Sequence, residues 1–268
     1  MQQTLAHVSD LHLGRSEDTD RRVRALCHAL VARGVDGVAV TGDVSHNGRR
    51  AEVERFFAIF DPYIRRDRLL VVPGNHDRLG HDVGDRLMSG DRVQVAGWPG
   101  VHAVRFDSTG PHNKAWLSGQ GEMSAEHIQQ IVEALDRAPA GALTLLLLHH
   151  HLLPYPQDSA AEWLSSMLGK AWTGELPLGR TLVERLRGRC DLVLHGHRHR
   201  PGTTTVFSES TRPLSVFNAG ASADRGHVRL FLHADGRLHA PPAWLPLGAK
   251  DRPSRSIVRE HVVLLNTP

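Results

Sequence analysis

The feature that most constrains the fold is an alternation of buried strands and amphipathic helices in the first 72 residues. Apolar runs at 5–8, 38–41 and 69–72 have the length of strands that are buried on both faces. Between these runs, apolar residues recur three and four positions apart, which is the spacing of one helix face. The two predicted helix faces consist of Val23, Leu26, Cys27 and Leu30 and of Val53, Phe56, Phe57 and Phe60. Strands that alternate with helices across short connections indicate a parallel sheet covered by helices.

The rest of the chain has a looser pattern, which favours a more antiparallel arrangement. We expect further strands at 93–95, 101–106, 143–148 and 192–194, and helices around 128–135 and 182–186. Apolar stretches at 203–207, 214–217 and 228–232 alternate or run together as in antiparallel strands. No internal repeat is present, and we expect one domain over 1–240, followed by a Pro- and Arg-rich extension over 241–268 that can pack on it.

Composition excludes several classes of protein. The chain has 268 residues of which 40% are hydrophobic, which suits a globular domain better than a disordered chain. Its apolar runs, such as Leu145 to Leu148, are far too short to span a bilayer, and the first residues lack the basic and apolar regions of a signal peptide. Cys27 and Cys190 are the only cysteines, too few for a disulfide scaffold. We therefore expect a soluble, cytoplasmic protein.

Histidine content is the more informative part of the composition. The chain contains 19 histidines, and imidazole is the commonest transition-metal ligand. The formal net charge of +3 is only a weak bias toward anionic partners and is not by itself typical of nucleic-acid binding.

Polar residues follow five of the predicted strands at the point where each strand ends. Taken singly, an Asp-x-His or a Gly-Asp is more commonly a structural turn than a site. The carboxyl ends of parallel strands, however, line one edge of a sheet, where ligands bind. The five segments are Asp10-Leu11-His12, Gly42-Asp43, Gly74-Asn75-His76-Asp77, His149-His150-His151 and His195-Gly196-His197-Arg198-His199. Their regular position predicts one shared site.

The donor types at this edge indicate metal binding. Residues two apart in extended chain point the same way, so Asp10 can act together with His12, and His197 with His199. Oxygen and nitrogen donors without a thiolate suit Mn, Fe, Zn or Co. The candidate ligands are Asp10, His12, Asp43, Asn75, His149, His197 and His199. Seven ligands fit two divalent ions that share a carboxylate, and ions about 3.5–4 Å apart promote in-line attack on phosphate esters.

In this order the motifs resemble those of the calcineurin-like metallophosphoesterases, which carry D-x-H, G-D, G-N-H-D/E, a later His and G-H-x-H. The resemblance covers residues 4–235 and implies a four-layer α/β/β/α sandwich of two mixed sheets, with the metals at the strand ends. The Leu-His-His-His run at 148–151 and the pair Asp107-Ser108 resemble bacterial class III cyclic-nucleotide phosphodiesterases and glycerophosphodiesterases.

The resemblance also implies roles for individual residues. Asp10, His12 and His199 would hold the first ion, Asn75, His149 and His197 the second, and Asp43 would bridge both. His149 is preferred to His150 and His151 because it is the first residue past its strand. His76 would stabilise or protonate the leaving group, and Asp77 would hydrogen-bond to His76 and orient it.

This resemblance implies a dinuclear-metal phosphodiesterase, in which metal-activated hydroxide hydrolyses a phosphodiester bond of a small molecule. The expected substrate is of the cyclic-nucleotide or the glycerophosphodiester type. The alternatives are a nuclease of the same superfamily, a lipid-precursor pyrophosphatase and a metal-binding scaffold without enzymatic activity. Nucleic acid is the less favoured partner, because no added DNA-contacting domain is visible.

Residues outside the motifs bear on substrate and assembly. The segment 152–180 lies between the fourth and fifth motifs, so it is expected either to cap the site with Trp163 and Trp172 or to form a contact in a homo-oligomer. Lys114, Arg78 and Arg198 are candidates for binding an anion, with solvated surface as the simpler interpretation.

Overall fold

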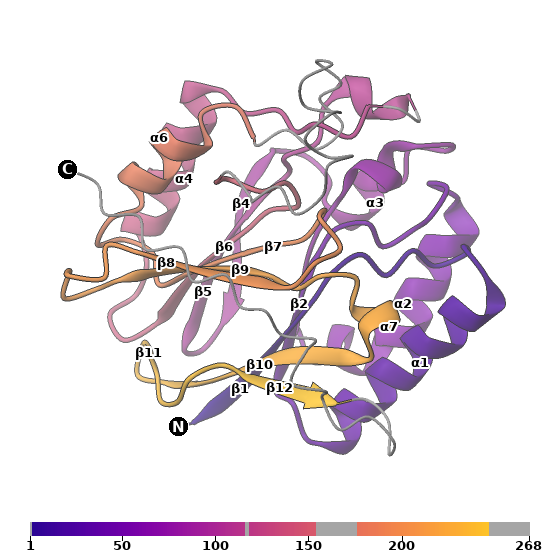
Figure 1. Ribbon diagram of the computed structural model, residues 1–268, viewed down its shortest axis with the longest axis horizontal. Helices are drawn as coiled ribbons and strands as arrows, with labels where there is room; N and C mark the ends of the chain where they lie inside the picture. The colour runs from indigo at the N-terminus through magenta and orange to yellow at the C-terminus, as the bar shows by residue number, and fades with distance from the viewer. Residues whose placement is uncertain (1, 116–117, 154–175, 247–268) are drawn as a thin grey trace, which may run out of the picture.

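In the computed structural model, two mixed β-sheets pack face to face and helices cover their outer faces (Figure 1). The structure describes residues 2–115, 118–153 and 176–246. This arrangement is the four-layer α/β/β/α sandwich of the sequence prediction, which is thereby confirmed. Among the described residues, no helix has both the length and the apolar character needed to cross a membrane.

The first sheet is built around the three parallel strands of the N-terminal alternation. Its strand order is β11-β10-β1-β2-β3, and β12 also pairs with β10. Leu5 lies beside Gly37 in the parallel pair and opposite Phe231 in the antiparallel pair of β1 with β10. The strands are β1 (Gln3–Val8), β2 (Gly37–Thr41), β3 (Leu69–Val72), β10 (His227–Ala234), β11 (Arg237–Leu238) and β12 (Ala243–Pro246).

The second sheet has a parallel centre and an antiparallel strand at each edge. Its order is β4-β5-β6-β7-β9-β8, in which β5, β6, β7 and β9 run parallel. The strands are β4 (Val93–Trp98), β5 (Val101–Phe106), β6 (Leu143–Leu147), β7 (Leu192–His195), β8 (Gly202–Val206) and β9 (Leu214–Asn218).

Helices cover the outer face of each sheet. The first sheet carries α1 (Glu17–Ala32) and α2 (Arg50–Ile64), and the second carries α4 (Ala125–Asp136) and α6 (Gly179–Arg185). Ser16 caps α1 by accepting a hydrogen bond from the Thr19 amide at 3.1 Å. Short elements complete the fold: η1 (Asn75–Arg78), α3 (Gly84–Leu87), η2 (Pro111–Lys114) and α7 (Ser222–Arg225).

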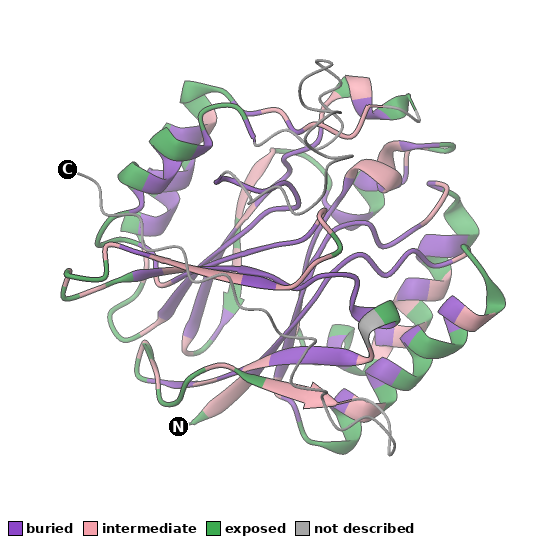
Figure 2. Ribbon diagram, in the orientation of Figure 1, coloured by how far each residue is buried: buried purple, intermediate pink, exposed green. Residues whose placement is uncertain are grey.

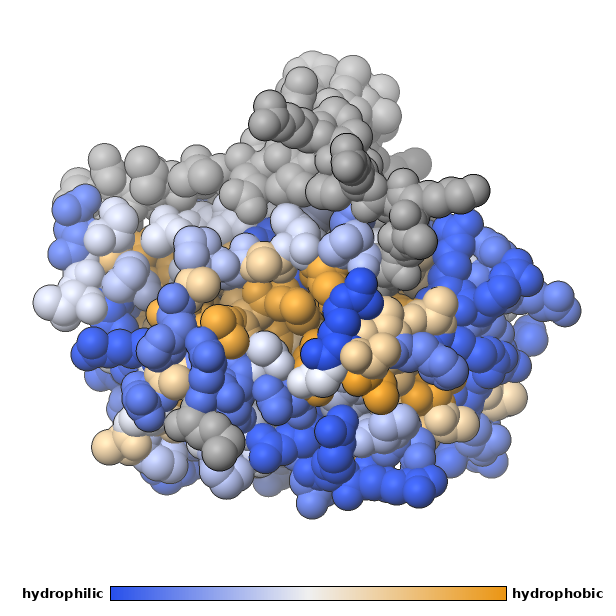
Figure 3. Space-filling model, turned by 90° about the horizontal axis from the view of Figure 1, so that it is seen from below, coloured by the Kyte–Doolittle hydropathy of each residue, from blue (hydrophilic) through white to orange (hydrophobic). Residues whose placement is uncertain are grey.

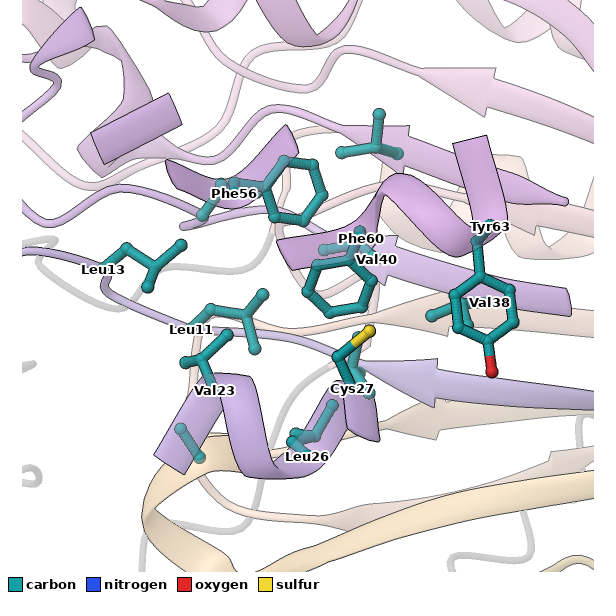
Figure 4. Close-up of a cluster of buried hydrophobic side chains, with 14 of the residues drawn as sticks. Leu11, Leu13, Val23, Leu26, Cys27, Val38, Val40, Phe56, Phe60 and Tyr63 are labelled. Atoms are coloured by element: carbon teal, nitrogen blue, oxygen red, sulfur yellow. The ribbon is translucent and has the colours of Figure 1, made fainter. Parts of the chain in front are cut away.

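Three apolar layers hold the sandwich together (Figure 2). Phe56 and Phe60 of α2 pack with Leu26 of α1 against the first sheet (Figure 4), and full burial of each such side chain stabilises the fold by about 1.5–3 kcal/mol. Between the sheets lie Leu5, Leu145 and other strand residues. On the face viewed in Figure 3, apolar residues gather in a central band with hydrophilic residues on either side and below it.

The last strands differ from the prediction in their pairing. The strands at 202–206 and 214–218 are antiparallel to each other, but β9 also runs parallel to β7, and β10 crosses to the first sheet and pairs with β1. β12 shows that the described start of the predicted extension belongs to the first sheet. The remainder of the extension, 247–268, and residues 154–175 of the predicted cap lie outside the described residues, and the domain limits stay a prediction.

Candidate metal centre

Hydrogen bonds donated by backbone amides join the segments that follow β1, β2 and β7. The amide of Asp10 donates to the Gly42 carbonyl at 3.1 Å, and the amide of His12 donates to the Asp43 carbonyl at 2.9 Å. The amide of His197 donates to both carboxylate oxygens of Asp10 at 3.1 Å. Polar residues from both sheets therefore meet at one edge of the sandwich, where the sequence predicted a shared site.

Close approach at this edge depends on two motif glycines. A Cβ atom on Gly42, whose φ is +87°, would lie 2.5 Å from Nδ1 of His149. A Cβ atom on Gly196 would lie 2.6 Å from Oδ2 of Asp10. Any larger residue at either position would separate strand ends that must touch for the site to form.

Five of the seven candidate ligands have a left-handed backbone, which costs a residue other than glycine of order 1–3 kcal/mol. Their φ values are 52° for Asp10, 47° for His12, 50° for Asp43, 73° for His197 and 52° for His199. The hydrogen bonds between the strand-end segments hold these residues in place, and such strain concentrates at functional sites.

Four candidate ligands form a first cluster. Nε2 of His12 lies 3.0 Å from Nε2 of His199 and 3.9 Å from Oδ2 of Asp43. Nε2 of His199 also lies 3.3 Å from Oδ1 of Asp10. The donor atoms of these four residues all fall within 4.8 Å of one another, which is close enough to surround one cation. Asp10, His12 and Asp43 are buried, whereas His199 is exposed.

The other three candidate ligands form a second cluster around the side-chain oxygen of Asn75. Nε2 of His149 and Nδ1 of His197 each lie 3.1 Å from this oxygen. The Nδ1–H of His149 donates to the Thr41 carbonyl at 2.8 Å, so the lone pair of the neutral ring is on Nε2. Orientation of a ligand histidine by a carbonyl in this way is common at metal sites.

Asp43 lies between the two clusters and offers one oxygen to each. Its Oδ2 faces His12 of the first cluster at 3.9 Å, and its Oδ1 faces His149 of the second at 3.4 Å. The carboxylate is only 2% exposed. This placement fits a ligand shared by two ions.

The charge balance of the clusters also fits cations. Burial alone would raise the pKa of Asp43, but the imidazoles of His149 and His76 hold it well below the usual range. Burial lowers the pKa of His149, but the carboxylates of Asp43 and Asp10 outweigh it and raise the pKa to about 9. Without a metal, a proton on His149 therefore supplies positive charge to these buried acids, and two divalent ions would supply it in place of the proton.

His76 lies at the rim of the same edge, beside Asp43. Its backbone amide donates to Oδ1 of Asp43 at 2.9 Å, and its Nδ1–H donates to the His46 carbonyl at 2.8 Å. The ring centroid lies 4.7 Å from that of His12. Because Nδ1 donates its proton to this carbonyl, the lone pair of the neutral ring is on Nε2.

Asp77 has a different role from the one expected of it. Its buried carboxylate accepts hydrogen bonds from the amides of Val44, Ser45 and Gly74 and from the Ser45 hydroxyl, at 2.6–3.2 Å. None of these bonds involves the ring of His76, so the predicted orienting hydrogen bond is wrong. Asp77 instead fixes the segment after β2 to the segment after β3, which positions Asp43 relative to His76.

The two histidines after His149 are buried beside the clusters. His150 accepts from the Ser108 hydroxyl through Nδ1 at 2.8 Å and donates through Nε2 to the Gly119 carbonyl at 3.0 Å. Both ring nitrogens are thus engaged, which favours a structural role. His151 stacks on the ring of His197 with centroids 6.1 Å apart.

Two of the three basic residues singled out in the sequence are bound to carboxylates. Arg78 binds the carboxylates of Asp82, Asp85 and Asp107, so it is neither solvated surface nor available to an anion. Lys114 pairs with Asp82 at 2.9 Å. Arg198 is partly buried within its motif. Trp163 and Trp172 lie outside the described residues.

Sequence reasoning missed His46. This residue follows Gly42-Asp43 by three positions, and its ring stacks on that of His76 with centroids 5.4 Å apart. A histidine so soon after a strand-end motif in a His-rich chain was the available signal.

Comparisons with known proteins agree with this arrangement. A family model described as calcineurin-like phosphoesterase matches residues 3–201. The structure of a dimetal phosphatase from Danio rerio is similar with a TM-score of 0.60 and 12% identity, over 92% of this chain and 99% of that one. A purple acid phosphatase from yellow lupin, Lupinus luteus, gives a TM-score of 0.56 at 12% identity, over 92% of this chain and 54% of its own. At such identity these structures show the fold alone. A search of curated protein sequences gave no match.

Proposed function

Because the chain belongs to the calcineurin-like phosphoesterase family, we propose that it is a phosphodiesterase that uses two divalent ions to hydrolyse a small-molecule diester, a cyclic nucleotide or a glycerophosphodiester. The observation that carries the proposal is the position of Asp43, whose two oxygens face different clusters. A carboxylate placed in this way is what a pair of ions needs from the protein.

Two sets of residues, with one carboxylate in common, would bind the two ions. Asp10, His12 and His199 would hold one ion, and Asn75, His149 and His197 the other, with Asp43 shared. When bound, two such ions polarise a phosphate ester and lower the pKa of a water molecule toward neutrality. The hydrogen bond from Nδ1 of His149 to the Thr41 carbonyl would leave Nε2 as the nitrogen of that ring that holds an ion.

His76 would act on the leaving group. The carbonyl of His46 holds the Nδ1 proton, and the amide of His76 is tied to Asp43, so the ring is fixed relative to the shared carboxylate. In the protonated ring, Nε2 can give a proton to the departing oxygen, a contribution of about 10²–10⁴-fold to the rate. Asp77 would support this geometry through the backbone.

Two arginines next to the motifs are engaged by carboxylates, which favours a diester over a monoester. A monoester dianion favours an additional arginine beside the metals, because a guanidinium matches phosphate oxygens in pairs. Arg78, the first arginine after the third motif, is bound to three carboxylates. Arg15, which follows the first motif, pairs with Asp224 at 2.5 Å. A diester carries a single negative charge and needs less compensation from the protein.

The experiment that tests the proposal is a substrate panel. Purified protein loaded separately with Mn, Fe, Zn and Co is assayed against phosphomonoesters, glycerophosphodiesters, cyclic nucleotides, a lipid-type pyrophosphate and DNA. We expect the highest kcat/KM for a small diester. A strong preference for monoesters, or hydrolysis confined to DNA or to the pyrophosphate, would overturn the proposed substrate class and leave the fold unaffected.

A further inference from the structure

Three imidazoles form a group at the rim that overlaps the first cluster in one residue only. The ligand nitrogens of His12, His46 and His76 all lie within 4.8 Å of one another. The rings of His46 and His76 are stacked at 5.4 Å, and both meet the ring of His12 edge-on, at 5.5 and 4.7 Å. His12 is buried, whereas His46 and His76 are partly exposed, so a cation can reach the group from solvent.

The donor chemistry of this triad differs from that of the first cluster. The first cluster combines two carboxylates with two imidazoles, and carboxylate donors suit Mn²⁺ and Mg²⁺. The triad offers nitrogen alone, and such donors favour Zn²⁺ and Cu²⁺ over Mn²⁺. Because Nδ1 of His76 is bound to a carbonyl, Nε2 is the atom that this ring can offer to a cation.

The two groups compete for His12. A neutral imidazole has a single nitrogen lone pair, so one ring cannot serve an ion in the triad and an ion in the first cluster together. An ion in the triad would also occupy the Nε2 of His76. Occupancy would therefore remove a ligand from the catalytic ions and the proton donor from the leaving group.

We propose that His12, His46 and His76 form a separate zinc site whose occupation inhibits the enzyme. The inhibition, though not the binding, rests on the proposed function. Zinc at low concentration can still serve the two shared-carboxylate positions, and the triad fills as free zinc rises. Manganese, which prefers carboxylate oxygen, does not fill it.

The binding test is equilibrium dialysis of the full chain in saturating Mn²⁺ with increasing free Zn²⁺, followed by measurement of both metals. His46→Gln removes one of the three ligands, and His28→Gln on the exposed face of α1 is the matched control. We expect His46→Gln to weaken zinc binding by at least about 10–100-fold, because the loss of a residue that only hydrogen-bonds to a metal ligand already has an effect in this range. Manganese binding in the absence of zinc should be unchanged. His28→Gln should bind both metals as the wild type does.

The activity test uses the same three proteins. Rising zinc should inhibit the manganese-loaded wild type and His28→Gln. For His46→Gln, inhibition is measured relative to the rate of this variant without zinc. The zinc concentration that half-inhibits His46→Gln should be higher than for the wild type by a factor similar to the loss of zinc affinity. Equilibrium dialysis measures zinc binding even if the protein hydrolyses none of the esters. Failure of the proposed function is therefore distinguishable from failure of the zinc site.

Identical zinc binding curves in wild type and His46→Gln would overturn the proposal, because zinc would then only replace manganese at the shared-carboxylate positions. A parallel loss of manganese binding in His46→Gln would also overturn it, because His46 would then support the main centre. His46→Asn and the thermal midpoint of each variant guard against a folding defect: the zinc effect should recur in both substitutions at an unchanged midpoint.

Discussion

Asp10 and Asp43, just past the carboxyl ends of β1 and β2, face imidazoles, whereas at the opposite end of the second sheet acids face arginines. There, Asp191 accepts hydrogen bonds from Arg212 at 2.7 and 2.9 Å and from the amide of Thr144 at 2.8 Å. Arg189 pairs with Asp136 at 2.9 Å. These residues line a hollow of about 930 Å³, and none of the seven candidate ligands contributes to its lining.

The difference lies in the partner that neutralises each acid. A guanidinium keeps its proton at every pH that the fold survives, so the acids at the arginine end are neutralised permanently and stabilise the structure. An imidazole is positively charged only while it is protonated, so Asp10 and Asp43 are neutralised either by a protonated imidazole or by a bound cation. The same sandwich thus has a structural end and a chemical end.

Asp43→Asn should have the largest effect on activity, because it removes the negative charge that both clusters share. We expect kcat/KM to fall by more than about 10⁴-fold, because a bound ion lowers the pKa of water from 15.7 to about 7 and this advantage would be lost. Metal content measured after dialysis should fall with activity. Near-normal turnover in this variant would refute a two-ion mechanism that depends on a shared carboxylate.

His76→Ala should separate metal binding from catalysis at the chemical end. Loss of the proton donor predicts a decrease in kcat of about 10²–10⁴-fold, with both ions retained. Metal analysis and steady-state kinetics on the same sample check this result. If the manganese-loaded variant lost an ion, His76 would be a ligand of the catalytic ions and its assignment to the leaving group would be wrong.

The stability of the metal-free protein should depend on pH in both directions from about 6.5. Burial holds the pKa of His12 and His151 near 3, so these rings are neutral in the fold; their contribution is present above pH 6.5 and is lost as the pH falls toward 3. Each would cost about 2 kcal/mol at pH 5. His149, with its pKa raised to about 9, contributes stability below pH 6.5 that is lost as the pH rises through 9.

Thermal unfolding of the metal-free protein across pH 5–9 checks this expectation. The midpoint should be highest near pH 6.5, and added metal should remove the decrease on the alkaline side, because an ion then replaces the proton on the cluster. A midpoint that rose steadily to pH 9 without metal would contradict the assigned protonation of His149.

Asp191→Asn, at the arginine end, should have the smallest effect: it should lower the stability of the fold and leave the activity unchanged. Loss of the charged partner of Arg212 should cost about 1–3 kcal/mol in the free energy of unfolding. Denaturant unfolding measures this cost, and kcat/KM at saturating metal should match that of the wild type. A large loss of activity would show that the two ends are coupled.

The sequence alone predicted most of the strands, though not β11 or β12, and proposed the set of candidate ligands. Apolar periodicity is local, so Leu69–Val72 and Val101–Phe106 were predicted with the bounds that the structure has. The positions of Asp10, Asp43 and Asn75 directly after strands then predicted a common edge, because parallel strands end together. These inferences needed only the neighbours of each residue along the chain.

Tertiary structure alone decided which side chains meet. Asp77 binds the backbone of Val44 and Ser45, more than 30 positions earlier, rather than the adjacent His76. Arg78 turns inward to Asp107, and His46 stacks on His76. Side-chain direction at a turn depends on φ and on the packing of the second sheet, and neither is encoded in local periodicity, so the partners of these residues became visible only when the two sheets were brought together.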